Sequence, residues 1–409
     1  MRNNILNKLI KLSFLSLAIL PLLKENINSI LIILCSVLII IYQIKKPQKI
    51  NFTKQTLILS LPFWMYLFYE VATLNVNLNF LLKQLPFLVF PILFLYKPPF
   101  IDKGIRDKSI NVFQGSVFLQ SLFYITYFLY FNSFRNIFKV RNNIPFFREF
   151  VSENYFFEIH PTYFSSFLLI SLTISLFNLI KNKNAFKVLN TLNILFTIFF
   201  IFLFSSKIIM LIVILTIILF LLISIKNKGI KFAKYSFLGF LILFSLLISP
   251  FKNVVGKRLS EIKTEYNKPI VGDYYNSINT RVAILKCAMI LQKEMPFLGY
   301  GGVLQDKLND CYSITNDSDF YKKHIFNTHN YYLNLLLYGG WLFLICFLLY
   351  LFYIVKKIKH SKIAIFIFFQ FLIINLTENY FSRHYGIVLF TYLISMFIFI
   401  REEKINNVS

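Results

Sequence analysis

Long apolar runs separated by short polar segments dominate the chain from end to end. The runs are continuous rather than alternating, and most approach the roughly 20 residues that a helix needs to cross a bilayer. Only helices and closed barrels satisfy their backbone in lipid, so continuous runs indicate helices. The pattern therefore predicts an all-α fold, a polytopic transmembrane helical bundle of about twelve spans. The predicted spans are residues 9–23, 27–44, 57–74, 80–96, 112–131, 161–179, 188–204, 208–225, 233–249, 333–355, 363–375 and 386–400.

Two polar segments, 132–160 and 250–332, are longer than the other connections. We predict a single membrane domain over residues 1–409, within which 250–332 forms one large loop that carries part of the active site. The first part of this loop, 252–279, is polar and rich in turn-forming residues. The part that follows predicts an amphipathic helix that suits a membrane interface. Its expected apolar side consists of Val282, Leu285, Ala288 and Met289.

Basic residues strongly outnumber acidic ones, with 43 Lys and Arg against 18 Asp and Glu and a net charge of +25. More than half of the basic residues lie in segments that share a side with the N-terminus. The short connections on the other side carry Lys24, Lys83, Lys207 and Arg383. By the positive-inside rule, the termini are cytoplasmic and the large loop lies outside. We interpret the charge as a topology signal, with codon bias as an alternative source, and expect no nucleic-acid partner.

Four cysteines divide into two pairs by position. Cys35 and Cys346 lie in apolar spans, where a thiol most simply packs. Cys287 and Cys311 share the large loop, and an outward location makes a disulfide one open possibility. The first apolar run lacks a small-residue cleavage site, so it predicts a first helix and not a removed signal peptide.

The large loop ends in the sequence NTHNYYL at residues 327–333 and passes directly into an apolar span. A neutral imidazole has an ordinary pKa near ~6.5 and can take a proton from a hydroxyl group. His329 is therefore a candidate base, although a histidine at this place can also simply hydrogen-bond at a helix N-terminus. Upstream in the same loop lie Arg281 and the glycine-rich turn PFLGYGG at residues 296–302.

The order of Arg281, Pro-x-x-Gly299-x-Gly301 and His329-Asn330-x-Tyr-Leu resembles the O-antigen ligase/polymerase family of bacterial membrane glycosyltransferases. The resemblance covers roughly residues 160 to 390. It implies that His329 is the base, that Arg281 is the family's loop arginine, and that Asn330, Gly299 and Gly301 bind substrate. A tryptophan common after the loop arginine is absent here.

The same resemblance assigns a role to Lys207, which follows two serines at a very short turn between two apolar spans. Family members often have Ser-Ser-Arg at this point, with the arginine thought to bind the lipid diphosphate. A lysine offers phosphate a point charge where arginine offers a bidentate fork, so the geometry is less constrained. The alternative for Lys207 is an interfacial lysine whose amine reaches water.

Two further clusters on the same side have counterparts in relatives. One is EIHPTY at residues 158–163, which contains His160, and the other is ENYFSR at 378–383, which contains Glu378 and Arg383. We include His160, Glu378 and Arg383 as candidate substrate-binding residues. Plain interfacial capping, or an ion pair between Glu378 and Arg383, is the alternative.

No metal-ligand spacing, Walker motif or dinucleotide glycine pattern occurs in the sequence, and we expect no cofactor. The resemblance implies a metal-independent, inverting transfer of a glycan from undecaprenyl diphosphate to an acceptor at the periplasmic face of the inner membrane. The expected partners are this lipid-linked donor, a glycolipid or glycan acceptor, and the bilayer. A ligase that uses lipid A-core is favoured over a repeat-unit polymerase of the same family. A lipid-linked glycan flippase or a non-catalytic scaffold is a more distant alternative.

Overall fold

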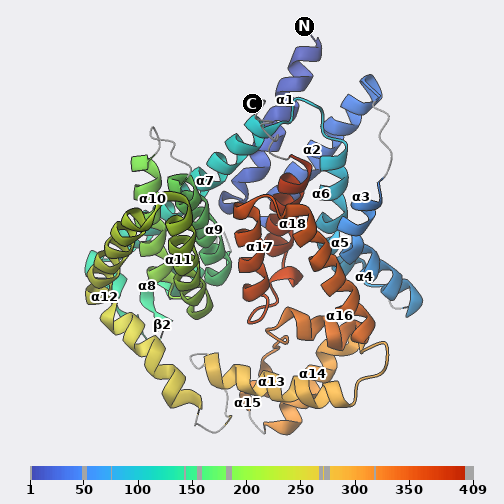
Figure 1. Cartoon of the computed structure of the whole chain (residues 1–409). Helices are drawn as coiled ribbons and strands as arrows, with labels where there is room; N and C mark the ends of the chain where they lie inside the picture. The colour runs from blue at the N-terminus through green and yellow to red at the C-terminus, as the bar shows by residue number, and fades with distance from the viewer. Residues whose placement is uncertain are drawn as a thin grey trace. The chain divides into compact units, whose positions relative to one another are not determined.

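A computed structural model describes residues 2–47, 53–74, 76–141, 144–153, 159–180, 187–266, 270, 277–316 and 319–400. Nearly all regular structure in these residues is helical (Figure 1), which confirms the all-α class of a polytopic membrane protein. The α-helices before the large loop are α1 Arg2–Ser16, α2 Glu25–Lys45, α3 Lys54–Leu59, α4 Leu61–Ala72, α5 Leu78–Gln84, α6 Pro86–Leu95, α7 Lys103–Phe131, α8 Phe146–Ser152, α9 Pro161–Ile180, α10 Lys187–Phe204 and α11 Lys207–Lys228. The later ones are α12 Ile230–Tyr266, α13 Ser277–Lys293, α14 Leu304–Thr315, α15 Asp319–Lys323, α16 Tyr331–Ile358, α17 Lys362–Ile374 and α18 His384–Phe399. The shorter elements are η1 Leu17–Leu22, η2 Phe134–Phe138, η4 Gly301–Val303, η5 Tyr380–Ser382, and the antiparallel strands β1 Val140–Arg141 and β2 Ile144–Pro145.

A helix lies at each of the twelve predicted span positions, but the helices differ in length. Among the described residues, nine helices are long and apolar enough to cross a membrane, and α17 and α18 are shorter apolar helices. The predicted third span is split into α3 and α4, of 6 and 12 residues. Ser60 and Pro62 stand at the break, and proline is well tolerated only in the first turn of a new helix.

The helices fall into two compact units, the first of which comprises Met1–Ser116, Ile345–Phe368 and Phe381–Ser409. Its core is aromatic. The ring of Phe87 lies 6.3 Å from that of Phe381 and 6.4 Å from that of Phe390, which joins α6 to the beginning and middle of the C-terminal segment. In the same unit, the ring of Phe14 in α1 packs edge to face against the ring of Phe94 in α6, with ring centroids 5.5 Å apart.

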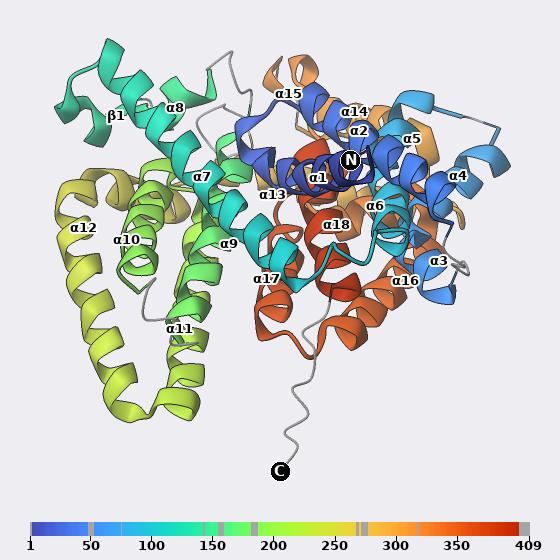
Figure 2. The ribbon, with the colours of Figure 1, turned by 90° about the horizontal axis from the view of Figure 1, so that it is seen from above.

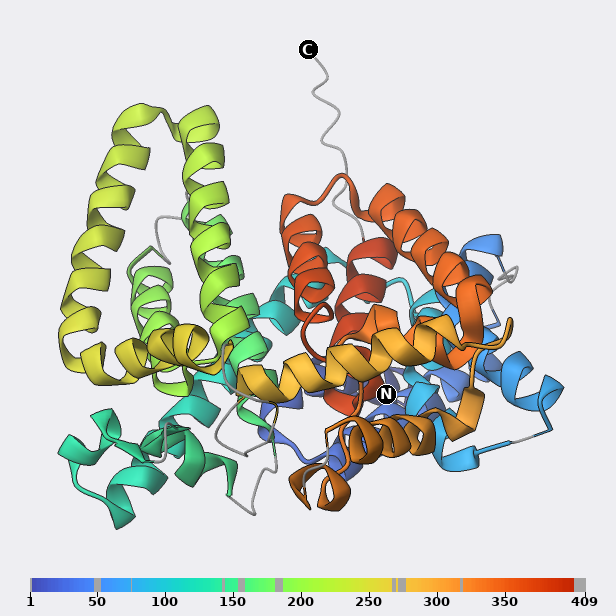
Figure 3. The same cartoon turned by 90° about the horizontal axis from the view of Figure 1, so that it is seen from below.

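The second unit comprises Val117–Leu344 and Phe369–Tyr380, and helix α9 lies at its centre. Nearly every residue of α9 from Pro161 to Phe177 is buried, and the helix packs against α10 and α11. Gln370 donates hydrogen bonds from Nε2 to the hydroxyls of Thr173 and Thr216, at 2.6 and 3.0 Å. Polar side chains between apolar helices hold them together where water is absent. Figures 2 and 3 show α11 and α12 of this unit as a long antiparallel hairpin.

The structure adds detail to two parts of the large loop. The segment expected to be rich in turns is helical as far as Tyr266, because α12 continues through Pro250 into polar residues that are themselves good helix formers. Helix α13 forms at the expected place, and Leu285 and Met289 of its expected apolar side are exposed, while another side of the helix is buried in the protein. The buried side is Ala283, Ile284, Cys287, Ala288 and Leu291. Contacts with α12 and α14, and the bond made by Cys287, select this side.

Candidate functional site

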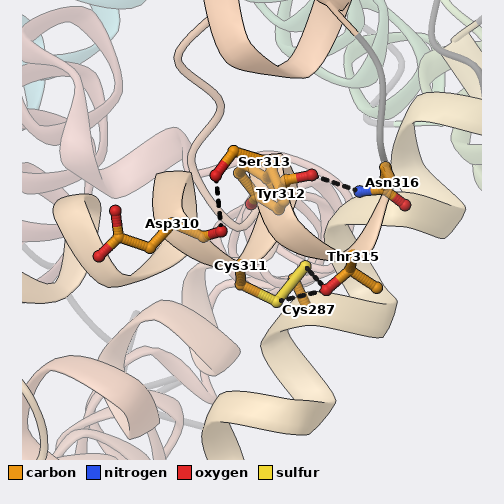
Figure 4. The surroundings of a disulfide bond; sticks show 7 residues. All are labelled: Cys287, Asp310, Cys311, Tyr312, Ser313, Thr315 and Asn316. Carbon is orange, nitrogen blue, oxygen red and sulfur yellow. Dashed lines mark hydrogen bonds between the residues drawn. A yellow bond between two sulfur atoms is a disulfide. The ribbon is translucent and has the colours of Figure 1, made fainter.

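A disulfide bond joins Cys287 of α13 to Cys311 of α14 (Figure 4), so the possibility left open by the sequence is realised. The two Cα atoms are 5.7 Å apart, and the bond spans 24 residues of chain. The hydroxyl of Thr315 lies 3.8 Å from one sulfur and 3.4 Å from the other. The bond fixes α13, which carries Arg281, to the helix on the far side of the glycine-rich turn.

The glycine-rich turn docks on the backbone of α16 at a kink in that helix. The backbone N–H of Tyr300 donates to the carbonyl of Leu337 at 2.8 Å. Gly299 has φ of +75°, and a Cβ built there would lie 2.5 Å from the Tyr338 carbonyl oxygen. Gly340 has φ of +71° and faces the carbonyl of Phe297 in the same close contact. Glycine is required at both positions because the two backbones touch, so Gly299 has a packing role that the substrate-binding expectation did not include.

The loop ends in a strained backbone at His329, whose φ is +44°. Its N–H donates to the side-chain oxygen of Asn327 at 2.9 Å, which closes a local turn. The next residue, Asn330, accepts from the Leu333 N–H at 3.0 Å and so caps α16. The Tyr331 N–H donates to the Asn375 carbonyl at 2.9 Å. A non-glycine residue in the left-handed region costs about 1–2 kcal/mol, and such strain gathers at functional sites.

The carboxylate of Glu378, in the segment between α17 and η5, is the centre of the site. Its Oε1 accepts from Nη2 of Arg281 at 2.7 Å, and its Oε2 lies 3.3 Å from Nδ1 of His329. The Glu378 side chain is only 12% exposed, whereas those of Arg281 and His329 are 39% and 29% exposed. One buried carboxylate therefore joins the arginine and the histidine of two separate sequence motifs.

Glu378 is held as an anion. Burial by itself raises the pKa of its carboxyl, but the hydrogen bond from His329 and the positive charges of Arg281, His329 and His160 outweigh burial. The pKa of Glu378 consequently lies below its ordinary value. An ionised carboxylate can only accept hydrogen bonds, so Nδ1 of His329 carries the proton. In neutral His329 the lone pair then lies on Nε2, which is the arrangement of a base oriented by a carboxylate.

The beginning of α9 forms the adjoining wall of the site. His160 is exposed and accepts the Thr162 N–H through Nδ1 at 3.3 Å. The ring of Tyr163 stacks on that of Tyr380 at 4.8 Å, and the Tyr380 hydroxyl lies 2.5 Å from that of Ser166. Because Tyr380 follows Glu378 by two residues, these contacts place the first turn of α9 beside the carboxylate.

The turn between α10 and α11, which carries Lys207, lies at the same end of α9. The ring of Phe204 packs on that of Phe164 at 5.3 Å, one residue beyond Tyr163. Ser205 is fully buried and has φ of +42°, and its hydroxyl has no hydrogen-bond partner among the described residues. Arg148 of α8 donates from Nη1 to the Phe204 carbonyl at 3.1 Å. The contacts along α9 thus connect the Lys207 turn to the Glu378 cluster.

Residues 192–348 match the family model described as O-antigen ligase. This part of the chain is therefore similar to the O-antigen ligase family, which supports the resemblance seen in the sequence motifs. Together with the apolar helices, the match supports a multi-pass membrane enzyme of the O-antigen ligase/polymerase family and suggests lipid-linked glycan substrates. No curated protein matches the chain. The matched O-antigen ligase region contains Lys207, Arg281 and His329, whereas Glu378 and His160 lie outside it.

The remaining candidate residues have the following places. Gly301, near the end of the glycine-rich turn, begins η4. Arg383 belongs to the first unit, where it is the N-cap residue of α18, and the ion pair of Glu378 is formed with Arg281. Glu158 lies outside the described residues. In the described part of the chain, no group of three or more His, Cys, Asp or Glu residues is placed to hold a metal ion.

Sequence reasoning missed Arg148 and the Tyr163–Tyr380 stack. Arg148 lies in the loop at 132–160, outside every quoted motif, and no local pattern points to it. Tyr163 was part of a quoted cluster, but its partner could not be read from spacing, because the two rings come from segments more than 200 residues apart.

Proposed function

We propose that this chain is a ligase that moves a glycan from undecaprenyl diphosphate to a hydroxyl of lipid A-core at the periplasmic face of the inner membrane. The observation that carries the proposal is the Glu378–His329 contact, in which a buried carboxylate orients a partly exposed imidazole at the end of the loop. A hydroxyl acceptor needs such a base because its proton must leave as the oxygen attacks. The family match supplies the class of substrate.

In the proposed step, Nε2 of His329 takes the proton of the acceptor hydroxyl. The acceptor oxygen attacks the anomeric carbon from the side opposite the diphosphate, and the bond between that carbon and the diphosphate oxygen breaks. The electron pair leaves with the lipid diphosphate, and the configuration at the anomeric carbon inverts. Glu378 stabilises the imidazolium as it forms, because its charge lies 3.3 Å from Nδ1.

The leaving diphosphate gains negative charge in this step, so fixed cations near it stabilise the transition state more than the ground state. Arg281 donates a hydrogen bond from Nη2 to Glu378, and a guanidinium has five N–H donors in all. Its partly exposed side chain can therefore position Glu378 and also meet phosphate oxygens. Lys207 supplies a second positive charge from the turn between α10 and α11. The step as written is driven by these cations and the base, and it uses no metal ion.

The test is glycan transfer in nanodiscs, with purified lipid-linked donor and lipid A-core acceptor. His329→Ala should lower the transfer rate by about 10²–10⁴, because a positioned base is lost. His324→Ala is the matched control, since His324 lies in the same loop but stacks on Phe320 at 4.6 Å, and it should transfer normally. Wild-type turnover in His329→Ala would remove the base from the mechanism.

The class of reaction is tested separately by mass spectrometry of glycolipids from a deletion strain. Complete glycan left on its carrier is the result expected of a missing ligase. Single repeat units at the cell surface would show a polymerase, and precursor trapped in the cytoplasm would show a flippase. Either of the last two results overturns the proposed reaction.

A further inference from the structure

A second cationic side chain meets the turn that carries Lys207. Arg148 belongs to α8 in the other long polar segment, and α8 packs against α10 in the second unit (Figure 1). Its Nη1 donates to the carbonyl of Phe204, the last residue of α10, at 3.1 Å. The acidic side chains of Glu149 in α8 and of Glu153, the C-cap residue of that helix, line a pocket with Arg141. The guanidinium of Arg148 therefore meets the turn that carries Lys207, although the two residues come from different parts of the chain.

The backbone of this turn also favours an anion. Ser206 is the N-cap residue of α11 but makes no side-chain capping bond, and the first N–H groups of a helix have no partner within it. Such a helix end attracts negative charge. Independently, the Ser205 hydroxyl is fully buried without a hydrogen-bond partner among the described residues, and its backbone is held at φ of +42°. A buried hydroxyl without a partner costs about 1–3 kcal/mol, which a ligand oxygen at this turn would recover.

The two cations differ in what they offer to a phosphate. The ammonium of Lys207 is a compact point charge on a flexible stem, whereas the guanidinium of Arg148 is planar and can donate two parallel hydrogen bonds. A diphosphate presents pairs of oxygens that fit such a fork. Nη1 of Arg148 donates a hydrogen bond to the Phe204 carbonyl, which fixes the plane of the guanidinium relative to the turn. A fixed plane lowers the entropy that binding would otherwise cost.

We propose that Arg148 is a further donor-binding residue, which supplies with Lys207 and the Ser205–Ser206 turn the guanidinium that holds the lipid diphosphate. The proposal rests on the proposed function, since it takes the diphosphate of the glycan donor as the ligand. It also explains how a chain with lysine at position 207 retains a planar phosphate donor at this turn. A purely structural Arg148 would serve contacts within the fold, such as the hydrogen bond that caps the C-terminus of α10.

Binding and transfer by Arg148→Gln separate these roles, because glutamine keeps an N–H donor for the Phe204 carbonyl but loses the charge. We expect Arg148→Gln to raise the KM for lipid-linked donor by about 10-fold or more, the size of a charge-assisted hydrogen bond, with the acceptor KM unchanged. Arg135→Gln removes the same charge from an exposed position in the same polar segment and should leave both KM values unchanged. Adding Lys207→Arg to Arg148→Gln should restore most of the affinity for the donor, because the turn then again carries a guanidinium that can donate two hydrogen bonds.

A loss in Arg148→Gln that affects donor and acceptor equally, lowers Tm and is not rescued by Lys207→Arg would reduce Arg148 to a helix cap. Normal kinetics in Arg148→Gln would overturn the proposal outright. Direct binding of undecaprenyl diphosphate to the purified protein, without acceptor, separates this inference from the proposed function. If wild type binds it and Arg148→Gln binds it weakly, the donor site stands even where no ligase product forms. If His329→Ala is inactive but Arg148→Gln binds like wild type, the function stands and the role of Arg148 fails.

Discussion

Replacing Gly299 by alanine tests whether the docking of the glycine-rich turn on α16 assembles the site. A Cβ at this position would lie 2.5 Å from the Tyr338 carbonyl oxygen and 2.7 Å from both the Gly340 nitrogen and the Leu337 carbonyl oxygen. All three atoms are backbone, so no side chain can rotate away. The turn and the helix must separate by roughly 1 Å to reach ordinary contact in a close-packed interior.

The energy follows from two local terms. Alanine at φ of +75° costs about 1–2 kcal/mol, and separation weakens the 2.8 Å bond from the Tyr300 N–H to Leu337, worth about 1 kcal/mol. We therefore expect the docked turn to lose about 2–3 kcal/mol. The turn connects α13, which carries Arg281, to α16, which begins two residues after His329. Because both side chains meet Glu378, a shift of about 1 Å here should lower transfer by about 10²-fold.

The assay combines glycan transfer in nanodiscs with a thermal unfolding curve of the same preparation. Gly115→Ala is the matched control, because no heavy atom lies within 4 Å of a Cβ built at that helical position. It should keep full activity and an equal or slightly higher Tm. A Gly299→Ala protein with wild-type transfer and wild-type Tm would refute the reasoning, as would an equal loss in both variants.

Two further predictions concern stability. Because the pKa of Glu378 is depressed in the folded protein, its ion pairs stabilise the fold above the ordinary pKa near 4.5, and this contribution is lost as the pH falls below that value. The Tm difference between wild type and Glu378→Gln should therefore be largest near neutral pH and shrink in acid, and a pH-independent difference would contradict the assignment. Reductant should lower the Tm of wild type but not of a Cys287→Ser/Cys311→Ser variant, because closing a loop of this length is worth about 3 kcal/mol in the chain-entropy model. Cys346→Ser should respond to reductant like wild type, and a wild-type Tm insensitive to full reduction would count against the bond.

The sequence alone determined where the membrane helices lie, because a segment can cross the lipid bilayer only if its own residues are apolar. Each stretch must be apolar over its own length and satisfy its backbone internally, whatever its neighbours do. The order of Arg281, the glycine turn and His329 indicated the family resemblance before any contact was known, because short motifs are visible in the sequence itself. Local reasoning was weaker at Ser60 and in the polar part of α12, where helix continuity depends on a proline and on polar residues that suit both helix and turn.

Tertiary structure alone decided how the site is joined together. Glu378 meets Arg281 across 97 residues and His329 across 49, and its sequence neighbour Arg383 was an equally reasonable partner on paper. The buried side of α13, the bond between Cys287 and Cys311, and the approach of Arg148 to the Lys207 turn likewise depend on which helices pack together. Hydrogen bonds and ion pairs act over a few ångströms in space, while sequence spacing constrains such distances only within a turn or two of helix.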